Sequence, residues 1–237
     1  SLGSVPHAFR LERDVLSKGP IDLLFVEAAV NDATNIPDSP QQMLRGMEGI
    51  IRHVKRISPR TDIVMLHFAM PEHVEDYRGG RTPLVISQHE RVADYYGIPS
   101  VNISREVSER ILAGEFTWET SIKDVHPSPF GQDLYSAAIR LLLDEALAAS
   151  RPNKPLKLPK KPLDPFCYDK GRFLPLSSAK LRSGFTIENE WTPRIGSGTR
   201  EGFVHVPAIS STTPGSSFSF EFTGRTAGLM IGSGPDT

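Results

Sequence analysis

Two nearly continuous apolar runs, residues 21–30 and 61–70, constrain the fold of this chain more than any other feature. Such runs are typical of strands that are buried on both faces of a parallel sheet. Between them, Ser39-Pro40 opens a stretch to Ile57 whose apolar residues keep helical spacing. Because strand and helix alternate with short turns, the sequence predicts an α/β fold with a parallel sheet.

The same alternation continues on both sides of these runs. Further helices are expected over residues 6–17, 84–96, 105–114 and 130–147, a short strand over 100–104 and a charged loop over 71–81. Sites in such sheets form beyond the carboxyl ends of the strands. Residues 1–149 are therefore predicted to form one α/β domain with its site at that edge.

The composition changes after residue 149. Residues 151–165 contain five prolines and five basic residues, which predicts an extended linker or strap over 150–165. Beyond it, short aromatic and β-branched runs alternate with Gly, Pro and Ser, as in all-β modules; the runs are 184–191, 202–206, 217–223 and 227–231. Four strands are few for a sandwich, so residues 166–237 are expected to be an incomplete, sandwich-like module.

The overall composition excludes several classes of partner. The 237 residues carry a net charge of -1 and no apolar run near the roughly 20 residues of a membrane helix. We therefore expect neither nucleic acid nor a membrane as a partner. The single cysteine, Cys167, excludes internal disulfides and leaves the redox compartment open. Localisation is unknown; activity on glycans would be compatible with a secreted or periplasmic protein.

One loop carries a candidate catalytic group, His126, two residues after Asp124. Pro127 keeps His126 out of the α region, while Ser128 can cap the next helix and Pro129 can occupy its first position. The imidazole is thus held at a helix start beside a carboxylate, which suits a general base. The alternative is a surface histidine with one hydrogen bond.

A second candidate, Asn31, stands with Asp32 at the end of the first predicted strand. Its carboxamide could donate a hydrogen bond to an oxyanion. The parallel arrangement lets the loop with His126 reach the same edge of the sheet. No metal or other cofactor is expected, because His67, His73 and His89 show no ligand spacing.

Together the two motifs resemble the GDSL-like, or SGNH, hydrolase superfamily of esterases and lipases. The resemblance covers residues 1–149 and implies a flavodoxin-like, three-layer α/β fold. It implies that His126 is the general base, Asp124 its orienting acid, and Asn31 and Gly3 the oxyanion-hole donors. In the family the aspartate stands three residues before the histidine, where this chain has Lys123.

The family's Gly-Asp-Ser block, which carries the nucleophile, has no counterpart here. No strand precedes Ser4, so Ser4 is not expected to replace it, and the nucleophile is expected upstream of residue 1. The strand carrying that block would pair with residues 21–30, which are too apolar for an exposed edge. An N-terminal segment or a second chain is therefore expected to cover that edge.

The resemblance implies a serine ester hydrolase, and a β module beside it favours a carbohydrate acetyl esterase acting on small esters or acetylated glycans. One alternative is a non-catalytic glycan-binding protein in which Trp191, Phe203 and Phe185 line a sugar platform. Another is a structural adaptor that uses the α/β part as a scaffold. Phe116 and Trp118 could wall an acyl pocket or pack the loop of His126.

Overall fold

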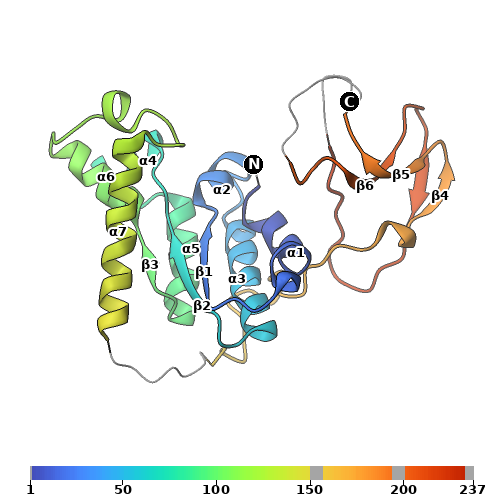
Figure 1. The fold of residues 1–237 in the computed structure, drawn as a ribbon, viewed down its shortest axis with the longest axis horizontal. Coiled ribbons are helices and arrows are strands. Elements are labelled where there is room, and N and C mark those ends of the chain that lie inside the picture. The colour runs from blue at the N-terminus through green and yellow to red at the C-terminus, as the bar shows by residue number, and fades with distance from the viewer. Residues whose placement is uncertain (1, 150–156, 194–200, 233–237) are drawn as a thin grey trace. The chain divides into compact units, whose positions relative to one another are not determined.

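The computed structural model describes residues 2–149, 157–193 and 201–232. The chain forms two compact units, Ser1–Arg172 and Phe173–Thr237, which are described one at a time (Figure 1). The first unit extends past the predicted start of the β module at residue 166. Part of the predicted linker, residues 150–156, lies outside the described residues. In the part of the chain that the structure covers, no helix is both long and apolar enough to cross a membrane.

The first unit is built on a parallel sheet of three strands, β1 (Leu23–Glu27), β2 (Asp62–Leu66) and β3 (Ser100–Val101). Their order is β1-β2-β3, with Phe25 opposite Val64 and Leu66 opposite Val101. The predicted parallel α/β fold is confirmed.

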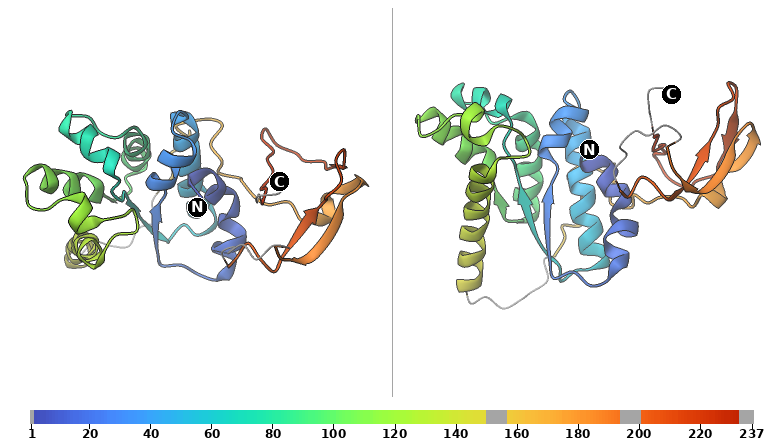
Figure 2. Two further views of the ribbon diagram at one scale, coloured as in Figure 1. Left: turned by 90° about the horizontal axis from the view of Figure 1, so that it is seen from above. Right: turned by 45° about the horizontal axis from the view of Figure 1, so that its top comes forward.

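Helices cover both faces of this sheet. They are α1 (Ser4–Asp14), α2 (Ala29–Asn35), α3 (Pro40–Ile57), α4 (Pro71–Arg78), α5 (Leu84–Tyr96), α6 (Ile103–Leu112) and α7 (Pro129–Ala148), with short turns η1 (Leu16–Lys18) and η2 (Trp118–Ile122). Figure 2 shows α7 on one face of the sheet and α3 with α5 on the other. The arrangement has the three layers expected from the sequence.

The main core lies between the sheet and helices α1, α3 and α5. Met47, Ile51 and Val54 of α3 are fully buried there against Val26 of β1 and Met65 of β2. This is the apolar stripe that the helical spacing predicts. The buried apolar stripe ends at Val54, one turn before the end of α3. Ile57, the last residue of the helix, is exposed to solvent.

Two predicted boundaries are wrong. The strand predicted over residues 21–30 ends at Glu27, and α2 starts at Ala29, so Asn31 and Asp32 lie in a helix and not at a strand end. The Glu27 carboxylate accepts a hydrogen bond of 3.2 Å from the backbone N–H of Val30, which helps to turn the chain. The loop predicted over 71–81 is largely helix α4, which begins at a proline in the first helical turn.

Strand β1 forms one edge of the sheet in the described residues. Leu24 and Val26 point into the core, whereas the alternate residues Leu23 and Phe25 are 38% and 39% exposed. The prediction that this strand is buried on both faces is therefore wrong for one face. A segment or second chain that covers this edge stays a prediction.

Residues 157–172 pack on α3 as a strap. Glu48 of α3, which is fully buried, accepts hydrogen bonds from the backbone N–H groups of Leu163 (2.6 Å) and Asp164 (2.9 Å). Arg45 forms an ion pair of 2.9 Å with the Asp164 carboxylate. The basic, proline-rich composition thus encodes an ordered strap over these residues, held by buried hydrogen bonds.

The second unit contains two antiparallel strand pairs. β4 (Lys180–Ser183) pairs with β7 (Ser217–Ser219), and β5 (Thr186–Trp191) pairs with β6 (Val206–Ser210). No described side chain of this unit is fully buried. Of the predicted runs, 184–191 and 217–223 contain strands. Strand β6 begins only at the last residue of the run 202–206, and the run 227–231 forms no strand.

Candidate active site

The first half of the candidate site is the turn that leads into α1. Asp32 of α2 is only 1% exposed, and its carboxylate accepts hydrogen bonds from the backbone N–H of Ser4 (2.8 Å) and from the Ser4 hydroxyl (2.6 Å). The carboxylate thereby satisfies a free N–H in the first turn of α1 and lies at the positive end of that helix. The contact joins two elements whose residues are 28 apart in sequence.

Gly3 fits this turn because it has no side chain. A Cβ at this position would lie 2.0 Å from Oδ1 of Asp32, far inside van der Waals contact. Gly3 is buried, and its backbone N–H donates no hydrogen bond to any described residue. Among the described residues it is therefore a backbone donor without a partner, as an oxyanion hole requires.

Asn31 precedes Asp32 in α2 and is half-buried. Its carboxamide forms no hydrogen bond with any residue that the structure describes, so its N–H groups remain available to a ligand. Since Asp32 is fixed by Ser4, Asn31 and Gly3 belong to two segments that one carboxylate ties together. The structure brings these two predicted donors into one neighbourhood.

The second half of the site is the loop with His126 and Asp124, whose side chains are 86% and 65% exposed. Nδ1 of His126 lies 3.4 Å from Oδ1 of Asp124, beyond the roughly 2.6–3.2 Å of a good catalytic hydrogen bond. The same Oδ1 instead accepts the backbone N–H of His126 at 2.9 Å. This backbone hydrogen bond is the main cause that lowers the pKa of Asp124.

Local capping fixes where this loop ends. The Ser128 hydroxyl accepts the backbone N–H of Gly131 and Pro129 is the first residue of α7, as the sequence predicts. Tyr135, one turn and a half further along, accepts the backbone N–H of Ala69, just past the end of β2 (3.1 Å). The start of α7 therefore lies at the carboxyl end of the sheet.

The two halves lie at the same edge of the sheet. In Figure 1 the strands' carboxyl ends point up, toward α2 and toward the start of α7. Within the described ranges, no hydrogen bond or ion pair joins His126 or Asp124 to Asn31 or Gly3. The edge holds all four predicted residues, but their side chains form two separate groups.

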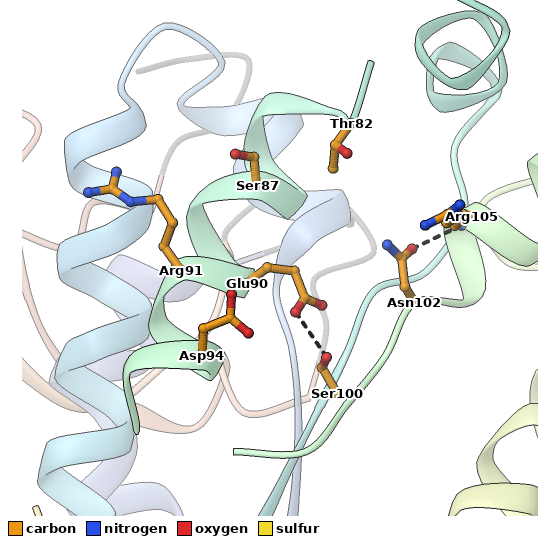
Figure 3. A pocket seen from close by; sticks show the side chains of 8 residues that line it. All are labelled: Thr82, Ser87, Glu90, Arg91, Asp94, Ser100, Asn102 and Arg105. Atoms are coloured by element: carbon orange, nitrogen blue, oxygen red, sulfur yellow. Dashed lines mark hydrogen bonds between the residues drawn. The ribbon is translucent and has the colours of Figure 1, made fainter. Parts of the chain in front are cut away.

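The described cavity lies elsewhere. An open hollow of about 500 Å³ runs beside β3 and contains none of the predicted site residues. Figure 3 shows Glu90 and Arg91 of α5 on one side of it and Arg105 of α6 on the other. Glu90 accepts hydrogen bonds from Ser100 (3.0 Å) and from His67 (2.6 Å), so its carboxylate is already occupied.

The buried histidines His67 and His73 form hydrogen bonds with neighbouring side chains. His67 contacts Glu90, and His73 contacts the Ser104 hydroxyl at 2.7 Å. Among the described residues, no group of three or more His, Cys, Asp or Glu side chains could hold a metal ion. The histidines are structural hydrogen-bonding groups in the core.

The aromatic residues around the His126 loop pack on one another. Phe116 lies edge to face with Phe130 of α7 at 5.0 Å, and Phe116 and Trp118 are half-buried against the core formed by α6 and α7. Packing of the loop is thus observed, whereas an acyl pocket stays a prediction. In the second unit Trp191, Phe203 and Phe185 are also half-buried, which leaves the predicted sugar platform open.

Comparisons with known proteins agree with this geometry. A family model described as GDSL-like Lipase/Acylhydrolase family matches residues 3–134, a range that includes all four predicted site residues. No curated protein matches the chain in sequence.

Two similar solved structures are crystal structures of a two-domain esterase (CEX) active on acetylated mannans, one of them co-crystallized with mannopentaose. They share 23% and 22% sequence identity with this chain, with TM-scores of 0.62 and 0.63, and cover 92% of it. This chain spans about half the length of each, 53% and 54%. At this identity the likeness shows the fold.

Proposed function

The chain belongs to the GDSL-like lipase/acylhydrolase family, and from this premise we propose that it supplies the general base and the oxyanion hole of a serine ester hydrolase. The observation that carries the proposal is that the matched range contains Gly3, Asn31, Asp124 and His126, on segments at one edge of the sheet. Parallel α/β sheets bind ligands at that edge.

Each residue has a defined task in the reaction. A serine hydroxyl attacks the ester carbonyl, and His126 takes the serine proton and returns it to the leaving alcohol. The carbonyl oxygen becomes negatively charged, and the N–H groups of Asn31 and Gly3 donate to it. Asp124 orients the imidazole after the ring moves toward its carboxylate.

The nucleophile of the proposed reaction is not Ser4. Ser4, the serine nearest the oxyanion donors, is fully buried and donates its hydroxyl to Asp32, so it has no free path to a substrate. The edge position of β1 in the described sheet leaves its outer backbone groups open to pairing with an additional strand. Such a strand would end beside α2.

The substrate class is an acetylated polysaccharide. The two similar structures are of an esterase active on acetylated mannans, and they match 92% of this chain, including its second unit. Removal of an acetyl group needs only a small acyl site. Acetylated mannan is therefore the first polymer to test.

Binding of glycans without hydrolysis is the second candidate. Phe218, Phe220 and Phe222 alternate along one strand direction, with ring centroids 6.3 and 5.9 Å apart, and Phe222 is 47% exposed. A row of aromatic faces suits stacking against sugar rings. This observation supports carbohydrate binding whether or not the first unit is catalytic.

Hydrolysis of p-nitrophenyl acetate and release of acetate from acetylated mannan by the full-length protein test the proposal. His126→Ala is expected to lower kcat/KM by about 10²- to 10⁴-fold, and Asn31→Ala by about 10²- to 10³-fold, because each removes a group used in the transition state. His205→Ala, a change of an exposed histidine in the second unit, is the control.

The outcomes separate the candidates. If His126→Ala keeps wild-type activity while the protein hydrolyses acetyl esters, the assigned base is wrong. If the wild-type protein binds mannan and releases no acetate, the second candidate replaces the first.

A further inference from the structure

His89 is a fully buried histidine that the proposed mechanism does not use. It lies on α5, and its Nε2 is 3.0 Å from Oδ2 of Asp32. The same oxygen accepts the hydroxyl of Ser4. Asp32 therefore has three donors, two from the start of α1 and one from α5.

Asp32 connects the two proposed oxyanion donors. Its contacts with Ser4 fix the turn that contains Gly3, and Asn31 is its neighbour in α2. The Asp32 carboxylate therefore links the turn of Gly3 to the helix that carries Asn31. Oxyanion donors need fixed positions, because a displacement of about 1 Å can cost about 10²-fold in rate.

The hydrogen bond from His89 to Asp32 joins two buried side chains. Burial lowers the pKa of His89, so the ring stays neutral and its Nε2–H donates to the carboxylate, while Nδ1 has no hydrogen-bond partner in the described residues. Ala29 of α2 packs in the same region against Val85 and Ile86 of α5. One polar and one apolar contact therefore dock α2 onto α5.

We propose that His89 is a positioning residue of the oxyanion hole: by donating to Asp32 it holds the segments of Gly3 and Asn31 in register. The inference rests on the proposed function, since it concerns the same oxyanion hole. It goes beyond the predicted site, because sequence spacing connects His89 with none of the four residues.

Two substitutions of His89 in the full-length protein separate positioning from plain packing. His89→Leu keeps most of the volume and removes the donor, and kcat is expected to fall about 10- to 100-fold with KM nearly unchanged. His89→Gln keeps an N–H donor in a similar place, and kcat is expected within about threefold of wild type.

His53→Leu is the matched control. His53 is also buried, 1% exposed, but its Nε2 faces Glu12 at 3.3 Å and not Asp32. The control is expected to lose stability as His89→Leu does and to keep its kcat. Equal losses of kcat in both leucine variants, or no rescue by glutamine, overturn the inference.

A double-mutant cycle with Asn31→Ala separates this inference from the proposed function. If His89 acts through the oxyanion hole, the two effects on kcat are less than additive, because one of the two donors that His89 positions is already gone. If Asn31→Ala has no effect by itself, the proposed oxyanion hole fails. If Asn31→Ala impairs hydrolysis but the two effects add, only the positioning role fails.

A smaller change covers the case in which His89→Leu does not fold. Ser4→Ala removes one of the other donors to Asp32 and is expected to lower kcat by about 3- to 10-fold, again without a change in KM. Ser108→Ala removes an equally buried hydroxyl that donates to the backbone of Ser104 and is expected to leave kcat unchanged. Equal kcat values in the two variants overturn the inference.

Discussion

The two halves of the candidate site are built in opposite ways. Around Gly3 and Asn31, a buried carboxylate on α2 accepts hydrogen bonds from α1 and α5, so tertiary contacts fix the backbone before any substrate arrives. Around His126, the side chain is 86% exposed, and the loop is shaped mainly by contacts within its own sequence and with η2. The proposed oxyanion hole is thus held by buried contacts, whereas the side chain of the proposed general base is exposed.

This difference follows from what each half must do. Donors that stabilise a transition-state charge contribute most when they need no reorganisation, which requires burial and several partners. A general base must accept a proton and later release it, and its hydrogen bonds often tighten only in the complex with substrate. The comparison leads to three predictions beyond those for His126 and His89.

The largest effect on activity is expected for a substitution that forces the turn of Gly3 away from Asp32. In Gly3→Ala the new Cβ would lie 2.0 Å from Oδ1 of Asp32, so the carboxylate must leave Ser4. We expect kcat/KM for p-nitrophenyl acetate to fall about 10²- to 10³-fold and the free energy of unfolding to fall by about 1–3 kcal/mol. Kinetics and urea denaturation measure the two quantities.

Gly228→Ala is the control for this substitution, because no atom lies within 4 Å of a Cβ at that position. If Gly3→Ala is as active and as stable as this control, the turn at Gly3 is not rigid, and the contrast between the two halves disappears.

A second prediction concerns the pH dependence of stability that the buried imidazole of His73 causes. Burial lowers the pKa of His73 from 6.5 to about 4, so the unfolded chain binds more protons than the folded chain between these values. The contribution of His73 to the free energy of unfolding is therefore present above pH 6.5 and is lost as the pH falls toward 4. Between pH 7 and pH 5 the loss is about 2 kcal/mol.

His73→Asn keeps a polar group facing Ser104 and does not titrate. Relative to wild type, its free energy of unfolding in urea is expected to improve by about 2 kcal/mol from pH 7 to pH 5. Parallel pH dependence in wild type and His73→Asn would contradict the prediction.

The smallest effect is expected in the exposed half. Removing the buried aspartate of a preformed triad costs about 10⁴-fold in kcat, but Asp124 is 65% exposed and lies 3.4 Å from the ring nitrogen. We therefore expect Asp124→Asn to lower kcat only about tenfold. Asp133→Asn, an exposed change on α7, is the control. A loss of three orders of magnitude would mean that substrate binding closes the loop into a rigid triad.

Much of the fold could be predicted from local patterns. Helix α5 begins and ends at the predicted residues, and α7 begins where Ser128 and Pro129 predict it, because caps and periodicity involve only neighbours in sequence. Helix α4 was missed because its sequence is mostly charged and it buries only His73 and Val74. The end of β1 was placed too late because an apolar run does not distinguish a strand from the first turn of a buried helix.

The sequence by itself determined the parallel α/β plan, the loop that presents His126, and Gly3 and Asn31 as candidate donors. Only the tertiary structure decided that Asp32 receives Ser4 and His89 and that Asp124 binds a backbone N–H in preference to the ring. The physical reason is the separation along the chain over which each effect acts. Periodicity and capping act over a few residues, whereas the partner of a buried carboxylate is set by the packing of helices far apart in the chain.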